Sequence, residues 1–159
     1  MIEYLTKQTP DRQSNPRIGV SLAVWKGEEI LLGLRPKNEF DEYECWGLPG
    51  GRLEFGENPF ECALRECREE TGITPDDATF INHDILPVYD SGKFNGGHWV
   101  TLFFEIGVKE ETFANQCEPD KCETWLWLTL DETRNIKLFP PTLTFIKYAL
   151  RQSYLRKHA

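Results

Sequence analysis

The sequence has little positive charge and no long apolar run. Of its 159 residues, 18 are Lys or Arg and 26 are Asp or Glu, which gives a net charge of −8 and a pI near 4.9. A surface that binds nucleic acid needs clustered Lys and Arg to displace counter-ions, so this balance argues against a nucleic-acid partner. No stretch reaches the roughly 18 apolar residues of a membrane span, and the first residues lack a basic region followed by an apolar run. We expect a soluble, cytoplasmic protein without a membrane partner.

The cysteines lack the spacing of a disulfide framework or a zinc site. Their number is odd, and no two of them stand in a C-x-x-C pair. Cys117 and Cys122 are separated by four residues, but neither a second pair nor a nearby His completes the four soft ligands of a structural zinc site. We therefore expect five reduced thiols, at Cys45, Cys62, Cys67, Cys117 and Cys122.

The length suits one domain with enough interior for a sizeable core. No boundary or repeat stands out, so we expect a single domain over residues 1–159, in which residues 1–16 form an N-terminal extension. Apolar patterns predict strands over residues 17–25, 29–35, 79–89, 98–108 and 123–130. The first two strands are predicted to form a hairpin, and the next two to be joined across residues 90–92.

A last helix is predicted to open at Pro140-Pro141-Thr142. One side of this helix carries Leu143, Ile146, Leu150 and Tyr154. Strands, a helix, more strands and a final helix are typical of an α+β sandwich.

Another helix is predicted directly behind the turn at Gly50 and Gly51. Asn58 can cap its first backbone amides, Pro59 suits the first helical position, and Gly72 ends it. Apolar or small residues at helical spacing predict a stripe that faces a core, formed by Phe60, Ala63, Leu64, Cys67 and Thr71.

Three glutamates of this helix share a face beside the apolar stripe. Glu66, Glu69 and Glu70 stand at positions i, i+3 and i+4, so their carboxylates converge and repel one another. A divalent cation would relieve that repulsion. Because no imidazole or thiolate pattern accompanies the carboxylates, hard ions are favoured, with Mg²⁺ the first choice and Mn²⁺ the second.

The spacing of these residues resembles the Nudix box. Gly51, five residues, Glu57, seven residues and then residues 65–73 match the pattern G-x5-E-x7-R-E-U-x-E-E-x-G-U, in which U is a bulky apolar residue. Every fixed position matches, and the one departure is Cys67 at the first U, where an aliphatic residue is usual. The resemblance implies a Nudix-type α/β/α sandwich with a mixed central sheet. It also implies hydrolysis of a nucleoside diphosphate linked to another group.

The resemblance assigns roles within the box. The metal ligands that it implies are Glu66, Glu69, Glu70 and the main-chain carbonyl of Gly50. Glu66 and Glu70 are the strongest of these ligands, and Glu69 is a further ligand or the base. Glu57 and Arg65 are expected to orient the ligands through a charge-assisted contact, and a plain ion pair is the alternative for these two residues.

A second resemblance, to the MutT-related branch that hydrolyses nucleoside triphosphates, reaches beyond the box. The stretches that carry it are residues 31–35, 46–57, 98–101 and 118–127. The resemblance implies that Arg35 and Arg52 bind phosphates, although related proteins carry His at the position of Arg52. Glu118 is implied to approach the metals from an opposing loop, as a base or an extra ligand. A solvated loop acid is the alternative for Glu118.

The same resemblance implies a base pocket that includes Thr101, Leu138 and Phe139. For Phe139, ordinary core packing is the alternative to stacking on a base, because aromatic residues are more often part of a core. Core packing is also what we expect of the tryptophans in or beside the predicted strands, which are Trp46, Trp125 and Trp127.

The predicted function is metal-dependent hydrolysis of a nucleoside triphosphate to a nucleoside monophosphate and pyrophosphate. A nucleotide sugar, ADP-ribose or a dinucleoside polyphosphate is the alternative substrate, because the box recognises the diphosphate and says little about its substituents. A noncatalytic nucleotide-binding module is a further hypothesis, against which the retained Glu66, Glu69, Glu70 and Arg65 argue. The sequence leaves a homodimer possible.

Overall fold

The computed structural model describes residues 15–37, 44–94 and 97–158, so most of the predicted N-terminal extension lies outside the described residues. Its strands are β1 (Arg17–Lys26), β2 (Glu29–Arg35), β3 (Cys45–Gly47), β4 (Gly50–Arg52), β5 (Ala78–Phe94), β6 (Gly97–Val108) and β7 (Trp125–Thr129). Its helices are α1 (Pro59–Thr71) and α2 (Pro140–Lys157), and two short 3-10 helices are η1 (Pro75–Asp77) and η2 (Glu132–Asn135).

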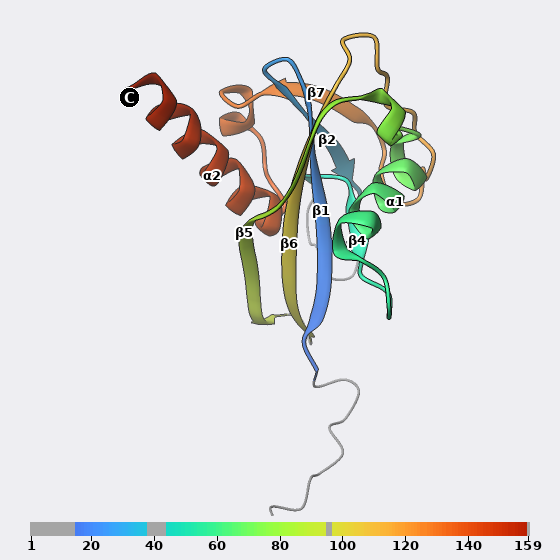
Figure 1. The fold of residues 1–159 in the computed structure, drawn as a ribbon. Helices are drawn as coiled ribbons and strands as arrows, with labels where there is room; N and C mark the ends of the chain where they lie inside the picture. Colours follow the sequence, from blue (N-terminus) through green and yellow to red (C-terminus); the bar gives the residue numbers. More distant parts are fainter. Residues whose placement is uncertain (1–14, 38–43, 95–96, 159) are drawn as a thin grey trace, which may run out of the picture.

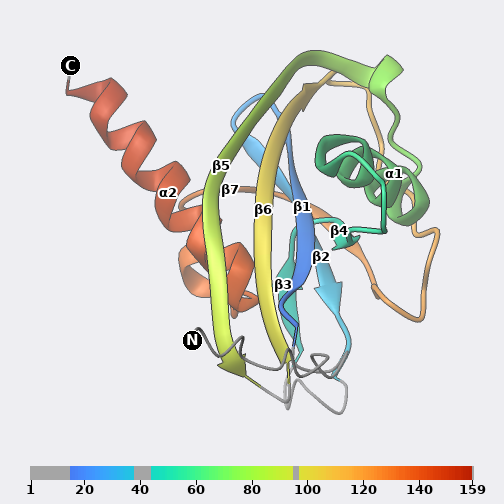
Figure 2. The ribbon, with the colours of Figure 1, turned by 60° about the horizontal axis from the view of Figure 1, so that its bottom comes forward.

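One mixed sheet of seven strands forms the centre of the fold (Figure 1). The main strand order is β3-β2-β1-β6-β5, with β4 paired to β1 and β7 paired to β2. β1 and β6 run parallel, whereas the other pairs are antiparallel. The two helices cover opposite faces of the sheet (Figure 2). The predicted α+β class, with a mixed central sheet between two helical layers, is therefore confirmed.

Each face of the sheet has its own core, because successive side chains of a strand point to opposite sides. In β1, Val20, Leu22 and Val24 pack in the core beneath α1, while Ala23 packs in the core beneath α2. The predicted stripe of α1 is confirmed: four of its five residues are buried, and Leu64 packs partly buried against the same core. The three tryptophans predicted to pack in cores, Trp46, Trp125 and Trp127, also do so.

A gap between β1 and β2 determines where the glycine-rich turn lies. The two strands pair only at Trp25↔Ile30 and Lys26↔Glu29, and β4 takes the next available edge of β1, along Gly19–Ser21. The predicted hairpin is thus present but short. β4 and β3 were not predicted, because strands of three residues that contain glycine carry no alternating pattern.

The connection predicted at residues 90–92 was wrong. β5 continues through these residues to Phe94, and Asp90 pairs with Val100 of β6. The Ser91 hydroxyl also accepts a hydrogen bond from the Trp99 backbone N–H at 2.8 Å. β5 is an edge strand, where polar residues are tolerated. The polar residues at 90–92 therefore belong to the strand and do not mark a turn.

The apolar side predicted for α2 is buried only in part. Leu143 and Tyr154 are 39% and 61% exposed, whereas the residues of α2 that are buried are Pro141, Thr142, Phe145, Ile146 and Ala149. The C-terminal half of α2 extends beyond the sheet (Figures 1 and 2), and the exposed Tyr154 belongs to this half. Periodicity located the helix, but its rotation depends on the sheet beneath it.

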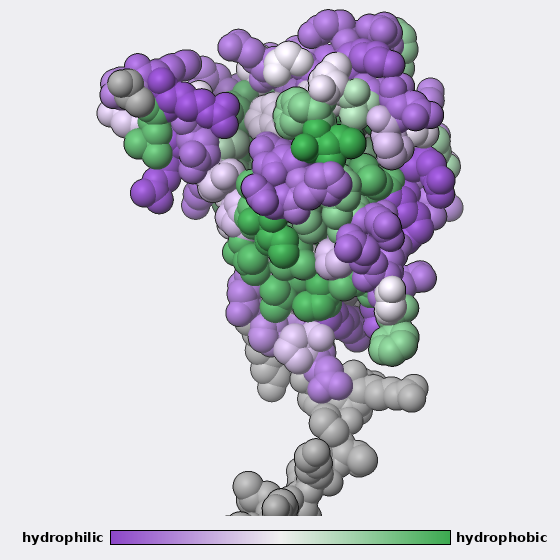
Figure 3. Space-filling view, in the orientation of Figure 1, coloured by the Kyte–Doolittle hydropathy of each residue, from purple (hydrophilic) through white to green (hydrophobic). Residues whose placement is uncertain are grey.

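Exposed apolar side chains gather on the edge strand β5. They are Phe80, Ile81, Ile85 and Val88. Figure 3 shows apolar surface on the side of the sheet between β5 and α1. A second chain can pack on such a surface, and the homodimer stays a prediction. In residues 15–37, 44–94 and 97–158, neither helix combines the length and the apolar character that a membrane crossing requires.

The observed rotation of α2 predicts different costs for two alanine substitutions. Phe145 is fully buried and its ring packs against Trp25, Phe103 and Tyr148, so Phe145→Ala should lower the free energy of unfolding by about 3 to 5 kcal/mol. Leu143→Ala on the same helix should lower it by less than about 1 kcal/mol. Urea denaturation of both variants would measure the difference, and similar costs would contradict the observed packing.

Candidate functional site

The Gly50-Gly51 pair allows α1 to lie directly against β4. A Cβ atom on Gly51 would lie 2.3 Å from the carboxyl carbon of Glu66, so this carboxylate occupies the space of a side chain. A Cβ atom on Gly50 would lie 2.2 Å from the Val20 carbonyl oxygen of β1. The Gly50 backbone N–H donates to Glu70 Oε2 at 3.0 Å. Two glutamates of the helix therefore contact the two glycines, Glu66 at Gly51 and Glu70 at Gly50.

Arg65 holds three glutamates together. Its Nε and Nη2 atoms donate to the two oxygens of Glu57 at 2.8 and 3.1 Å, which is a bidentate contact. Its Nη1 atom lies 2.8 Å from Glu66 Oε1 and 3.1 Å from Glu69 Oε2. The hydrogen bonds from Arg65 hold the pKa of Glu57 at about 2. The charge-assisted contact expected between Glu57 and Arg65 is present, and it extends to two of the predicted metal ligands.

Glu70 is a carboxylate that burial disfavours in its charged form. Burial raises its pKa to about 7, and the charges of Glu66 and Glu118 act in the same direction. The Gly50 N–H and the charge of Arg35 offset part of this effect. The negative charge at this position is therefore incompletely compensated.

The predicted ligands are brought close together but are engaged with other partners. Among the described residues, no three His, Cys, Asp or Glu side chains form a group that could hold a metal ion as they stand. Glu66 and Glu69 contact Arg65, Glu70 accepts from Gly50, and Glu118 contacts Lys121 at 2.9 Å. The donors are nonetheless carboxylate oxygens, which Mg²⁺ prefers. The residues thus fit a hard divalent cation.

Arg35 and the Leu138–Phe139 segment form a second part of the site. The Arg35 guanidinium lies over the Phe139 ring, 4.4 Å from its centre, and a Cβ atom on Gly47 would lie 2.9 Å from Arg35 Cδ. Leu138 and Phe139 are held to β3 through Trp46, whose carbonyl accepts from the Phe139 N–H at 2.8 Å. Arg35 Nε is buried without a hydrogen-bond partner in the described structure. Such an unpaired cationic donor is suited to an anionic ligand.

Arg52 and Thr101 lie on the sheet face opposite α1. A row across four strands joins Arg52 of β4, Gly19 of β1, Thr101 of β6 and Tyr89 of β5. Paired residues of neighbouring strands point to the same side, so Arg52 and Thr101 share this face. Thr101 is buried, and its hydroxyl lies 3.2 Å from the position of a Cβ atom on Gly19.

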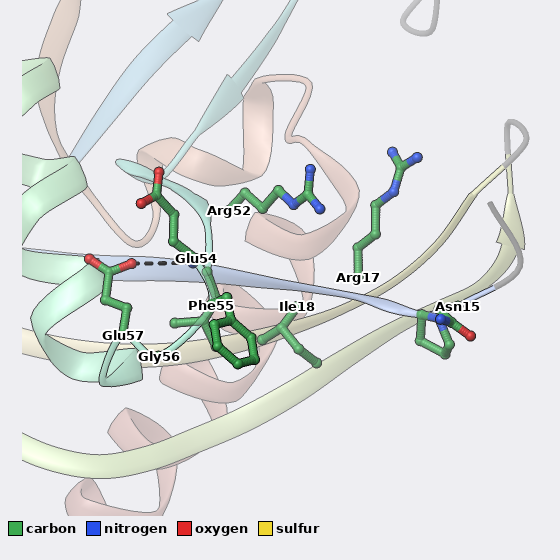
Figure 4. Close-up of a pocket in the computed structure, with 10 residues that line it drawn as sticks. Asn15, Arg17, Ile18, Arg52, Glu54, Phe55, Gly56 and Glu57 are labelled. Atoms are coloured by element: carbon green, nitrogen blue, oxygen red, sulfur yellow. Dashed lines mark hydrogen bonds between the residues drawn. The ribbon is translucent and has the colours of Figure 1, made fainter. Parts of the chain in front are cut away.

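Two further residues that the sequence did not single out adjoin the site. Arg17 stacks on Trp99 at 5.5 Å and, with Arg52, lines an open cavity of about 540 Å³; both side chains extend to the same side of β1 (Figure 4). Cys62 lies 3.4 Å from Arg65 Nη2. The proximity of Arg17 to Arg52 depends on the pairing of β1 with β4, which the sequence did not reveal. The i, i+3 spacing of Cys62 and Arg65 could have been seen in the sequence.

Comparison with known proteins identifies the family of the chain. The model of the NUDIX domain matches residues 15–148. The chain belongs to the Nudix family. A solved structure of a MutT NUDIX hydrolase from Burkholderia pseudomallei is 30% identical, with a TM-score of 0.71, and covers 84% of this chain and 97% of its own.

Named relatives of this Nudix hydrolase are pyrophosphohydrolases of several kinds. An RNA pyrophosphohydrolase from Roseobacter denitrificans is 30% identical over 138 residues, which cover 78% of this chain and 82% of the relative. An ADP-ribose pyrophosphatase from Methanocaldococcus jannaschii is 35% identical over 95 residues, 59% of this chain and 52% of the relative. The chain spans only 18% of a matched fusion protein from Bifidobacterium longum, a nucleoside triphosphate pyrophosphatase joined to a Nudix hydrolase. The family and the MutT-like resemblance predicted from the sequence are confirmed.

The contact between Gly51 and Glu66 predicts a coupled effect on stability. Gly51→Ala places a methyl group against the Glu66 carboxylate and should lower the free energy of unfolding by about 2 to 3 kcal/mol. A Glu66→Ala background removes the three atoms nearest to the added methyl group, so the same change should cost less than about 0.5 kcal/mol. Urea denaturation of the four proteins in EDTA completes the cycle. Equal costs in both backgrounds would show that Glu66 does not occupy this space.

The raised pKa of Glu70 predicts that its charge destabilises the metal-free protein. The folded state holds the Glu70 proton up to about pH 7, above the ordinary value of 4.5, so stability should fall as pH rises through this window. Glu70→Gln removes the titration and should be the more stable protein at pH 8, by up to about 3 kcal/mol, but not at pH 4. Denaturation in EDTA at both pH values tests this, with Glu61→Gln, an exposed acid of the same helix, as the control. Parallel pH profiles for all three proteins would contradict it.

Proposed function

We propose that this Nudix hydrolase converts a nucleoside triphosphate to a nucleoside monophosphate and pyrophosphate by attack of water at phosphorus. The observation that carries this proposal is that a cluster of carboxylates and an unpaired guanidinium nitrogen lie close to each other. The carboxylates of Glu66, Glu69 and Glu70 suit a divalent cation, while the unpaired guanidinium nitrogen of Arg35, whose charge acts on Glu70, suits a phosphate. A polyphosphate with its metal ions satisfies both groups at once.

Mg²⁺ bound here would neutralise a diphosphate and lower the pKa of a coordinated water. The residues proposed to hold it are Glu66, Glu69, Glu70, the Gly50 carbonyl and Glu118. Mn²⁺ is the second choice.

Arg65 and Glu57 are proposed to orient the ligands, because Arg65 contacts Glu66 and Glu69 directly and is itself fixed by both oxygens of Glu57. Glu69 is the more exposed of the two contacted glutamates, at 45% against 11% for its side chain. Solvent access makes Glu69 the better candidate to accept a proton from water.

The substrate is proposed to extend from the metals toward two groups of residues. Arg35 and Arg52 would bind phosphate oxygens, since neither forms an ion pair among the described residues. Phe139 and Leu138, held beside Arg35, would contact the base, and Thr101 would contribute a hydroxyl on the face that Arg52 shares. The partly exposed Phe139 and its contact with Arg35 support a binding role over core packing.

ADP-ribose is the second candidate substrate, because a relative that is 35% identical is named for its hydrolysis. A 5′-triphosphorylated RNA should also be tested as a substrate, because the relative from Roseobacter denitrificans, whose match covers 78% of this chain, is an RNA pyrophosphohydrolase. Nucleotide sugars and dinucleoside polyphosphates remain alternatives, and binding without cleavage of any of these compounds would favour a noncatalytic module.

A panel of these nucleotides with Mg²⁺ tests the choice of substrate. We expect pyrophosphate release from nucleoside triphosphates with the highest kcat/KM, and AMP with ribose 5-phosphate would instead identify ADP-ribose hydrolysis. Mass spectrometry of products formed in oxygen-18 water then shows which phosphorus is attacked.

Glu70→Gln tests the proposed ligand directly. The substitution keeps the side-chain volume and removes one ligand charge, so turnover should fall by at least about a hundredfold while the protein stays folded. Steady-state kinetics at saturating Mg²⁺, with circular dichroism as the folding control, measures this. A folded variant with near-normal turnover would defeat the proposal.

A further inference from the structure

Cys62 lies where three parts of the site meet. It is fully buried on α1, one turn before Arg65. Its Sγ atom accepts from Arg65 Nη2 at 3.4 Å and lies 3.5 Å from the carbonyl oxygen of Arg52, to which its S–H donates. Arg52 is the last residue of β4, directly after the two glycines on which the glutamates rest. One sulfur atom thus joins the helix, the strand and the Arg65 guanidinium.

We propose that Cys62 is a positioning residue, whose thiol fixes the Arg65 guanidinium and, through it, the orientation of Glu66 and Glu69. Arg65 Nη2 is shared between Glu57 Oε2 and Cys62 Sγ, while Nη1 contacts Glu66 and Glu69. The guanidinium is planar and rigid, so a change in the partners of Nη2 also moves Nη1. Removal of the sulfur leaves Nη2 held from one side only, beside an empty space.

The properties of a thiol suit this position between an anion and a cation. Burial and the neighbouring Glu57 raise the pKa of Cys62 to about 12, so the group stays neutral. The neutral thiol can donate to an oxygen and accept from Arg65 at the same time. Its contact also contributes to the lowered pKa of Glu57, after the larger effect of Arg65. A charged residue here would compete with the Glu57–Arg65 pair.

A second buried cysteine of the same helix provides a matched control. Cys67 is 1% exposed, and its sulfur contacts Thr71 at 3.5 Å, on the side of α1 that faces the core. Cys62→Ala and Cys67→Ala each remove one buried sulfur from α1, so both should lose stability. Only the first touches Arg65.

The inference rests on the metal-binding role proposed for Glu66 and Glu69. The binding of Mn²⁺ without nucleotide, monitored by electron paramagnetic resonance, tests the metal site and the role of Cys62 separately. We expect Cys62→Ala to weaken Mn²⁺ binding about tenfold, Cys62→Ser to stay within about threefold of the parent because its hydroxyl keeps both contacts, and Cys67→Ala to bind normally. Equal affinities for the two alanine variants, or a serine variant as weak as Cys62→Ala, would overturn the inference.

Two more variants complete the experiment. Glu66→Gln should lose Mn²⁺ binding. If Glu66→Gln binds Mn²⁺ normally, the proposed metal site itself is refuted. If Glu66→Gln is defective but Cys62→Ala binds normally, only the role of Cys62 is refuted. If Cys62→Ala does not fold, Cys62→Val fills the volume without a hydrogen-bonding atom and is compared with Cys62→Ser in its place.

Discussion

The close approach of α1 to β4 is the constraint on which the rest of the site depends. It is possible because Gly51 leaves the space that the Glu66 carboxylate fills, and because the Gly50 N–H is free to bond Glu70. A larger residue at Gly51 would push the helix away from the strand, and one at Gly50 would clash with the backbone of β1. The gap between β1 and β2, which β4 occupies along Gly19–Ser21, places this contact inside the sheet. The position of the carboxylates therefore follows from strand pairing as much as from the helix.

The arrangement concentrates negative charge in a way that the fold must tolerate. Arg65 compensates Glu57, Glu66 and Glu69, but its side chain is 25% exposed, so these pairs add only modest stability. Glu70 is partly buried with a raised pKa; it forms no ion pair among the described residues, and the charge of Arg35 offsets only part of the effect. Two well-packed cores, one under each helix, hold the sheet in spite of this local cost. A bound cation would offset this negative charge. The local cost in stability and the proposed activity therefore both come from the same carboxylates.

Local patterns made the helix of the box predictable, because its determinants lie within a few residues of one another. The Asn58 side chain accepts from the N–H groups of Phe60 and Glu61, and Gly72 ends the helix at a φ of 76°. The burial of α2 and the length of β5 lay beyond local patterns, because both depend on the sheet. Phe145 packs in the core beneath α2, and Asp90 pairs with Val100 of β6. The contact between Arg35 and Phe139 was beyond reach, since it joins residues a hundred positions apart.

β4 also explains how one short strand can serve two tasks. Gly51 faces Glu66 on the α1 side, while the next residue, Arg52, points to the opposite face, beside Gly19 and Thr101. The side proposed to hold the metal is fixed by the spacing of the box, because a shift of one residue would turn a carboxylate away from the strand. The opposite face carries no such restriction. Relatives named for RNA and for ADP-ribose are 30% and 35% identical to this chain, so the scaffold admits different substrates. Under the proposed function, substrate choice would reside in Arg17, Arg52, Thr101 and the residues around Phe139, and the chemistry in α1.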